Sequence, residues 1–280
     1  MRKLLYICLA GMLAVGCTKD KPVTVPCEFH LQTEWVKGSR AQFTITPSQN
    51  NAYYCYGVIA ADHPLYNQSD AEIIRYQTEW MHSDYANLRK EGHSDGDFLD
   101  MFCYKGVRAV KSTLLPPDTE HKLIVCQINP QTCEFIGPTH SKVFHTQPVP
   151  EVDLTFSIQY KDNMFRILPS DKNVTWFWEY EREEKVYDVY EDPYFFYYDI
   201  IDMYDEYGFL HHSLCMGDVE WVQPRDDRSI REGVPYVITL SACTADGEIC
   251  SDVVYAEFVF QNGKITFTYA DFPVEAITPD

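Results

Sequence analysis

Ten cysteines give this chain of 280 residues its most evident reactive chemistry. The spacing Cys-x6-Cys occurs twice, each time around a predicted turn, and the two pairs are Cys126 with Cys133 and Cys243 with Cys250. A two-residue hairpin turn such as Asp246-Gly247 places the flanking residues opposite each other, where the side chains come within bridging distance. The sequence therefore predicts hairpin disulfides, and the alternative is that these cysteines are half-buried thiols that only contribute packing.

Strand alternation predicts which way these cysteines point. Residues 236, 238, 240 and 242 share one face of a predicted strand, so Cys243 points to the other face, as Cys126 does in its own strand. We expect that outer face to lie beneath a helical segment. Cys103 and Cys215, near the ends of two helical segments, are alternative partners for the hairpin cysteines. A structural zinc site is a weaker alternative because the sequence has no closely spaced Cys-x2-Cys pairs, so no metal is expected.

Cys17 has a different predicted chemistry. A basic start at Arg2-Lys3 precedes an apolar stretch and the segment LAVGC, which resembles a bacterial lipoprotein signal with its lipidation cysteine. The apolar stretch of about ten residues is too short for a spanning helix, which needs about twenty. We expect an acylated Cys17 that anchors the mature chain in the cell envelope, at the periplasmic or surface leaflet of the outer membrane. The alternative is an ordinary secretory signal.

Residues 187–207 combine many tyrosines and phenylalanines with carboxylates. Aromatic rings offer a large contact area at low entropic cost, and carboxylates accept hydrogen bonds from sugar or amide groups. The sequence therefore predicts a ligand surface for a protein or a glycan, and its candidate residues are Tyr187, Tyr190, Tyr194 and Tyr198. The alternative is that the helical spacing of Tyr197, Ile200, Ile201 and Tyr204 marks core residues that pack against a sheet.

No catalytic or cofactor-binding residue is predicted, and we expect a chain that is not an enzyme. The sequence contains no phosphate loop, no Gly-x-Ser-x-Gly elbow and no His-Glu-x-x-His motif. His211 and His212 are adjacent and diverge from one element, so they are interpreted as a surface pair. The acidic run at 94–97 lacks the spacing of a calcium loop and is better explained by helix capping. A formal net charge of −19 repels phosphate backbones, so nucleic acid is not an expected partner.

An internal repeat indicates two similar domains. Residues 43–48 recur as residues 165–170, and the aromatic segment 53–56 recurs at the same offset as 175–178. Each copy opens with period-two alternation, which is typical of half-buried strands, and then changes to a helical pattern. In the second copy, Asp192-Pro193 supplies a helix N-cap and a first-turn proline. An Asn262-Gly263 turn near the end predicts an additional hairpin.

The closing part of the first copy carries a recognisable run, LPPDTEH at residues 115–121, that leads into an alternating strand. This run resembles fibronectin type III-like and immunoglobulin-like domains with helical inserts, which occur in Bacteroidetes lipoproteins. The resemblance implies a mainly β fold with helical inserts, in the form of two tandem fibronectin III/Ig-like β-sandwich domains. His121 stands where the family usually has an aromatic residue.

The predicted organisation therefore has five parts. They are a signal peptide at 1–16, a tether at 17–26, domain 1 at 27–147 with an insert at about 66–103, domain 2 at 151–272 with an insert at about 190–215 and a C-terminal hairpin, and a tail at 273–280. We expect a non-enzymatic cell-envelope lipoprotein that acts as a binding or adhesion module. The alternative is a glycan-binding accessory lipoprotein of a polysaccharide-uptake system. The expected partners are the membrane, through the lipid anchor, and a protein or glycan ligand.

Overall fold

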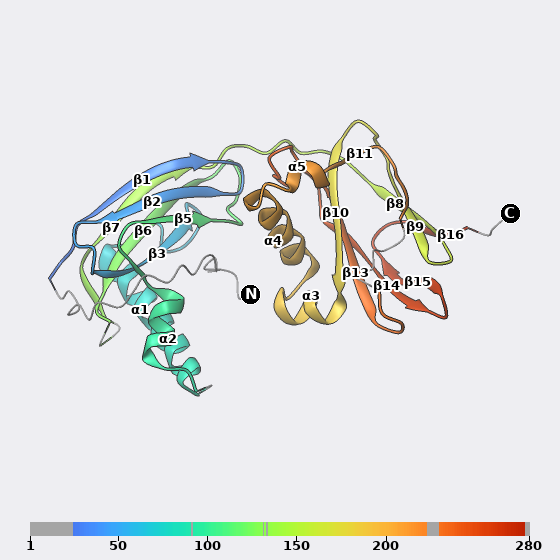
Figure 1. Ribbon diagram of the computed structural model, residues 1–280. Helices are drawn as coiled ribbons and strands as arrows, with labels where there is room; N and C mark the ends of the chain where they lie inside the picture. The colour runs from blue at the N-terminus through green and yellow to red at the C-terminus, as the bar shows by residue number, and fades with distance from the viewer. Residues whose placement is uncertain (1–24, 91, 131, 133, 223–229, 278–280) are drawn as a thin grey trace. The chain divides into compact units, whose positions relative to one another are not determined.

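The computed structural model describes residues 25–277, except 91, 131, 133 and 223–229 (Figure 1). The chain divides into two compact units, Met1–Pro148 and Val149–Asp280. None of the helices in the described part combines the length and apolar character needed to span a bilayer. The predicted lipidation residue, Cys17, lies outside the described residues.

Unit 1 is a β-sandwich interrupted by a helical insert. Its described elements are β1 (Phe29–Val36), β2 (Ala41–Pro47), β3 (Tyr53–Ala60), α1 (Asp70–Lys90), α2 (Asp95–Phe102), β4 (Tyr104–Lys105), β5 (Arg108–Ser112), β6 (Glu120–Ile128) and β7 (Phe135–His145). The strands form one sheet in the order β1-β2-β5 and another in the order β4-β3-β6-β7. Alternate residues of both sheets, such as Phe43, Tyr54 and Leu123, are fully buried in the core between them.

The helical insert of unit 1 begins with a reciprocal cap. The Ser69 hydroxyl accepts a hydrogen bond from the Glu72 backbone N–H at 3.4 Å, and the Glu72 carboxylate accepts one from the Ser69 N–H at 3.2 Å. This capping box stabilises the first turn of α1. Ile73 and Met81 then pack against the outer face of the β3–β6 sheet. The insert therefore covers a second apolar layer, separate from the sandwich core.

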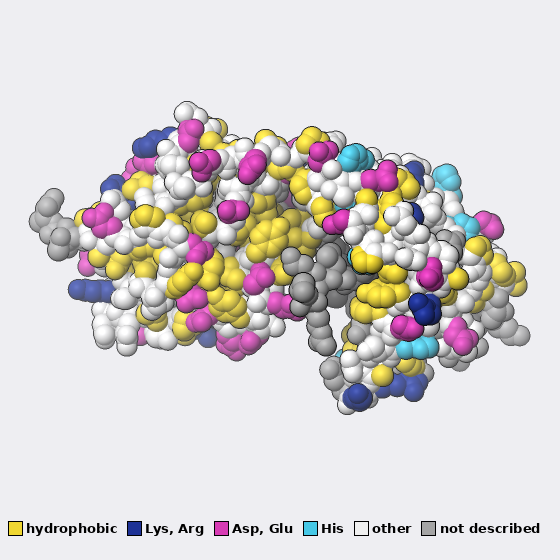
Figure 2. Space-filling model, turned by 180° about the vertical axis from the view of Figure 1, so that it is seen from behind, with side chains coloured by type: hydrophobic (Ala, Val, Ile, Leu, Met, Phe, Trp, Pro, Cys, Tyr) yellow, Lys and Arg dark blue, Asp and Glu magenta, His cyan; other side chains and the backbone are white. Residues whose placement is uncertain are grey.

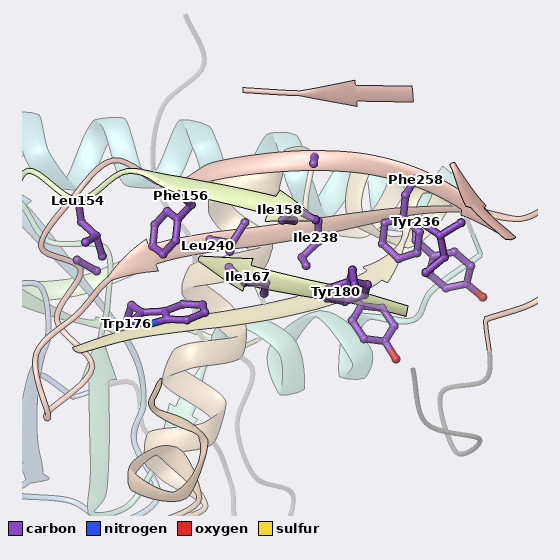
Figure 3. Close-up of a cluster of buried hydrophobic side chains, with 14 of the residues drawn as sticks. Leu154, Phe156, Ile158, Ile167, Trp176, Tyr180, Tyr236, Ile238, Leu240 and Phe258 are labelled. Carbon is purple, nitrogen blue, oxygen red and sulfur yellow. The ribbon is translucent and has the colours of Figure 1, made fainter. Parts of the chain in front are cut away.

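Unit 2 repeats this plan with additional strands at the edges. Its described elements are β8 (Phe156–Lys161), β9 (Met164–Pro169), β10 (Thr175–Arg182), α3 (Glu183–Val189), α4 (Pro193–Glu206), α5 (Leu210–Ser213), β11 (Cys215–Met216), β12 (Val219–Val222), β13 (Pro235–Ala242), β14 (Val254–Gln261), β15 (Lys264–Ala270) and β16 (Val274–Ala276). The sheet orders are β12-β9-β8-β16 and β11-β10-β13-β14-β15. Figure 3 shows side chains from both sheets meeting in the core, with Trp176 beside Phe156 and Tyr236 beside Phe258.

The expectation of a mainly β fold with two tandem sandwiches and helical inserts is confirmed. The repeated segments supply equivalent strands, since residues 43–47 lie in β2 and residues 165–169 lie in β9. The predicted C-terminal hairpin is also present, because β14 and β15 pair across Asn262-Gly263 with Gln261 opposite Lys264.

Two details of the predicted organisation are wrong. The expected tail at 273–280 contains β16, which pairs in parallel with β8 through Val274 and Ile158, a long-range contact without a local signal. The insert of unit 2 begins with α3 at Glu183, directly after β10, rather than near residue 190. The short α3 buries a single residue, Val186, so its sequence carries little amphipathic periodicity.

His121 is buried near the start of β6. Its Nε2 lies 3.1 Å from the Pro116 carbonyl oxygen, and its ring stacks on Phe144 with 5.2 Å between the centroids. Because a carbonyl only accepts, Nε2 carries the proton. Nδ1 has no hydrogen-bond partner among the described residues. Protonation of Nδ1 would therefore place an unpaired N–H and a positive charge in the core.

This environment predicts acid sensitivity of unit 1. Burial lowers the pKa of His121 from its ordinary value of 6.5; the hydrogen bond to Pro116 opposes this, nearby His145 lowers the pKa further, and Asp62 raises it. A lowered folded-state pKa means that the stabilisation is complete above about pH 6.5 and is lost as the pH falls from there toward the folded-state pKa. Hydrogen exchange of β6 amides between pH 5 and pH 8 should show this loss.

The matched comparison is the His121→Phe variant, which keeps an aromatic ring and removes the titratable imidazole. We expect a smaller dependence of β6 protection on pH in this variant, after correction for the intrinsic exchange rate. His30→Gln, at an exposed histidine of β1, should retain the dependence of the unsubstituted chain. An unchanged pH dependence in the His121→Phe variant would contradict the assignment.

Candidate functional site

The helical insert of unit 2 holds the predicted ligand surface, and its longest helix begins as its sequence predicts. The Asp192 side chain caps α4 by accepting a hydrogen bond from the Phe195 backbone N–H at 2.9 Å. Pro193 follows in the first turn, where its missing N–H costs no helical hydrogen bond. The N-cap fixes where α4 starts, and therefore which residues face the sheet.

One face of α4 packs against the sheet. Phe196, Tyr197, Ile200 and Ile201 are buried against the outer face of the β10–β13 sheet. The interpretation of residues at this spacing as core residues is confirmed for Tyr197, Ile200 and Ile201, whereas Tyr204 is half-buried beside them. This apolar layer also includes Phe177 and Val237 from the sheet and Val186 from α3.

Tyrosine hydroxyl groups fasten the insert to the strands below it. The Tyr197 hydroxyl lies 3.2 Å from the Phe177 carbonyl oxygen and 3.1 Å from the Ser241 carbonyl oxygen. The Tyr204 hydroxyl donates to Glu179 Oε2 at 2.8 Å. Burial raises the pKa of Tyr197 well above its ordinary value, so this side chain remains a neutral donor. These contacts hold α4 in one orientation on the sheet.

The four tyrosines predicted to form the ligand surface do not share one exposed face. Tyr187 is half-buried and donates to Glu257 Oε1 at 2.9 Å, and Tyr190 is half-buried with its ring edge-on to Phe196. Tyr198 is only 4% exposed, whereas Tyr194 is 44% exposed. Of the four, only Tyr194 is exposed. The helical period does not separate them, since positions 194 and 198 lie on the same side of α4 with 6.4 Å between their ring centroids. The packing around the insert therefore buries Tyr198 and leaves Tyr194 exposed.

Other apolar side chains of the insert are exposed instead. Tyr207 and Phe209, directly after α4, are 67% and 60% exposed. Gly208 separates them with a φ of +71°, which turns the chain away from the helix axis. From α3 through β11, the large exposed apolar side chains of the described residues are Val189, Tyr194, Met203, Tyr207, Phe209 and Met216. In the sequence, the exposure of Tyr207 and Phe209 could have been predicted from Gly208, because a glycine at this position indicates the end of a helix.

The charge around this insert is negative. The sequence has no lysine or arginine between Lys185 and Arg225, whereas Asp188, Glu191 and Glu206 are exposed acidic residues in that interval. Acidic and apolar side chains also lie intermingled on the molecular face that Figure 2 shows. An aromatic surface with this charge favours a neutral or cationic partner over an anionic one.

The structure does not fit the predicted Cys243–Cys250 disulfide, because the two side chains lie on opposite faces of the sheet, in two different apolar clusters. In the backbone pairing of the hairpin, Cys243 lies opposite Ile249, and the Cys250 N–H donates to the Ala242 carbonyl at 2.8 Å. The returning segment of the hairpin is therefore displaced by one residue from the predicted register. One residue reverses the face of a strand. Cys243 accordingly lies beneath the insert, as predicted from strand parity, whereas Cys250 lies in the sandwich core. Cys133 lies outside the described residues, so its pairing with Cys126 stays a prediction.

The described residues contain no group of three or more His, Cys, Asp or Glu side chains arranged to hold a metal ion. His211 and His212 are exposed on α5, with 3.7 Å between their ring centroids. Their side chains therefore lie at the surface, where the sequence places them. The chemistry that the insert of unit 2 offers is recognition by aromatic contact and by carboxylate acceptors.

The geometry thus defines a tandem β-sandwich protein with a helical insert on one sheet of each unit. Comparison with known proteins finds no family model that matches the chain and no matching curated protein. Among solved structures, the chain is similar to the fibronectin FN1–FN3 domains of chicken CNTN1. The identity is 8%, the TM-score is 0.28, and the match covers 92% of this chain and 69% of that chain. The fold assignment rests on the strand orders described above.

Proposed function

We propose that the chain is a non-enzymatic binding or adhesion module of the cell envelope. Its ligand surface lies on the insert of unit 2 and includes Tyr194, Tyr207 and Phe209. One observation carries the proposal: the insert buries one face against the sheet while three aromatic side chains on its free parts are between 44% and 67% exposed. Exposed aromatic residues on a rigid scaffold are the usual anchors of protein interfaces.

A protein partner fits this surface better than a glycan. The exposed set mixes the rings with Val189, Met203 and Met216, which contribute apolar contact but no flat face for stacking on a sugar. Methionine and aromatic side chains are enriched in protein interfaces. A glycan ligand remains the outcome that would assign the chain to polysaccharide capture.

The cellular location is proposed from the leader sequence. Cys17 follows a short apolar stretch and, once acylated, would anchor the chain to a membrane leaflet while leaving the two sandwiches outside the cytoplasm. A tether of about ten residues would then separate the lipid from β1. Such an anchor suits a module that presents a surface to a partner in the envelope.

The test uses full-length chain extracted from membranes with detergent and screened against immobilised envelope proteins and a glycan panel. Replacing both Tyr194 and Tyr207 by alanine should weaken the binding of the captured partner by about 30-fold or more, because truncation of an aromatic anchor typically costs about 2 kcal/mol. In the same preparation, Cys17→Ala should move the chain from the membrane fraction to the soluble fraction.

The matched control is Tyr76→Ala, which removes a tyrosine of similar exposure from α1 in unit 1. Its affinity should equal that of the unsubstituted chain. Equal affinity of the Tyr194/Tyr207 variant would overturn the location of the surface. Binding of a saccharide instead of a protein, lost in that variant, would support the glycan-capture function.

A further inference from the structure

Two cysteines of unit 1 lie directly opposite each other on adjacent strands. Cys55 in β3 is the ladder partner of Cys126 in β6. Both side chains point to the outer face of the sheet, where they join Ile73 and Met81 of α1 in one apolar cluster. Both residues are thiols in this structure, with Cys55 7% exposed and Cys126 2% exposed. The pairing therefore brings together two residues that are far apart in the sequence, beneath the helical insert.

The backbone spacing suits a covalent bridge. Opposed residues of an antiparallel pair have Cα atoms about 4.5 Å or about 5.5 Å apart, depending on the hydrogen-bond pattern. Both values lie within the range of about 4.4–6.8 Å that disulfides span. Because the two side chains share a face, their Cβ atoms approach each other more closely than those of diagonal neighbours.

A third thiol contacts the same cluster from the insert. Cys103 directly follows α2, and its backbone N–H donates to the Leu99 carbonyl at 2.9 Å. Its side chain is partly buried against the cluster that holds Cys55 and Cys126. Unit 1 therefore gathers three thiols where the insert meets the sheet.

The equivalent place in unit 2 shows that the fold does not require cysteines there. The ladder pair that corresponds to Cys55 and Cys126 is Phe177 opposite Ser241. Leu214 takes the place of Cys103, since each immediately precedes the short strand that pairs with β10 or β3. Phenylalanine, serine and leucine therefore meet the packing needs of this layer. Unit 2 has one thiol in this layer, Cys243, but its equivalent ladder position holds no opposed pair of thiols.

We propose that Cys55 and Cys126 form a cross-strand disulfide in the oxidised protein, while Cys103 remains a thiol. The two thiols exchange with a disulfide oxidant, either glutathione disulfide or the active-site disulfide of an oxidoreductase. One S–S bond forms between the strands, and the S–S bond of the oxidant breaks. Two electrons and the two thiol protons pass to the oxidant, which leaves as two thiols. The bridge encloses the whole helical insert between its ends.

Burial of the two thiols determines when the disulfide forms during folding. The apolar cluster raises the pKa of the Cys55 thiol well above its ordinary value, and the neighbouring thiols of Cys126 and Cys103 raise it further. Only the thiolate attacks a disulfide, so the folded, reduced chain reacts slowly. The bridge therefore forms during folding, before the insert covers the sheet. Once formed, it is shielded from reductants in the same way.

The experiment refolds the full chain in a buffer of reduced and oxidised glutathione, blocks the remaining thiols by alkylation and maps unreduced tryptic peptides by mass spectrometry. We expect the peptide that contains Cys55 to be linked to the peptide that contains Cys126. Since Cys126 and Cys133 lie on the same tryptic peptide, a Cys133→Ser chain is mapped in parallel. Folded, reduced chain exposed to glutathione disulfide should form the bridge at least about tenfold more slowly than chain that oxidises while it refolds.

Several outcomes would overturn the pairing: alkylated Cys55 and Cys126 after refolding, a link from either one to Cys103, or an internal bridge between Cys126 and Cys133. A second readout is the thermal midpoint of unit 1 with and without reductant. It should fall on reduction in the unsubstituted chain and in the Cys250→Ala control, but not in the Cys55→Ala variant. Because the refolding uses purified chain, the result does not depend on the proposed envelope location or ligand.

Discussion

Replacing Trp176 by alanine is expected to lower the free energy of unfolding of unit 2 by about 3–5 kcal/mol. Trp176 is the largest fully buried side chain among the described residues, and its ring centroid lies 5.2 Å from that of Phe156, which belongs to the facing sheet. Its indole Nε1 also donates to the Gly217 carbonyl at 3.1 Å. The substitution would therefore create a cavity between the sheets and remove the hydrogen bond that holds the end of the insert to β10.

Denaturant unfolding followed by far-ultraviolet circular dichroism would measure this loss without relying on the fluorescence of the removed residue. Trp221→Ala is the matched control, because Trp221 is half-buried at the surface, where Lys161 and Arg166 lie over its ring. We expect the control to cost about 1 kcal/mol or less. A loss below about 1 kcal/mol for Trp176→Ala would show that the two sheets close over the vacated space.

The second large effect is expected at Tyr197, which joins α4 to the sheet beneath it. Tyr197→Ala should cost about 3–5 kcal/mol, since it removes a fully buried aromatic ring. Tyr197→Phe keeps the ring and removes only the hydroxyl that lies near the carbonyl oxygens of Phe177 and Ser241. That variant should cost about 1–2 kcal/mol. The difference between the two variants separates ring packing from hydrogen bonding.

The measurement is the free energy of unfolding of unit 2, together with hydrogen exchange of the α4 amides. Tyr207→Ala controls for loss of a tyrosine from the same insert, and its 67% exposure predicts a change of less than about 0.5 kcal/mol. If Tyr197→Phe were as damaging as Tyr197→Ala, the hydroxyl rather than the ring would dominate the attachment of α4.

Local patterns account for the parts of the fold that the sequence predicts well. Period-two alternation locates β8 and β13, because each of these strands buries one face between the sheets. The helix α4 follows from the cap at Asp192-Pro193, and the C-terminal hairpin follows from Asn262-Gly263. In each case the residues that specify the element lie within or beside it.

The remaining errors concern contacts that no local pattern encodes. The face of Cys250 depends on one residue of register at the end of a hairpin. The opposition of Cys55 and Cys126, which was not predicted, depends in the same way on the pairing of β3 with β6 across the whole insert. Which residues of the candidate surface are exposed also depends on long-range packing. The helical period shows that α4 has a buried stripe, but the packing of the insert decides that Tyr198 is buried and Tyr194 is exposed.

The short strand β16 has a consequence for how copies of the protein avoid one another. It pairs with β8 through Val274, Glu275 and Ala276, and so occupies hydrogen-bonding groups at what would otherwise be the free edge of a sheet. An uncovered edge strand is a template for another chain, whereas a three-residue edge offers a partner little to extend. The last described strand thus protects the β8 edge of this sheet against edge-to-edge aggregation.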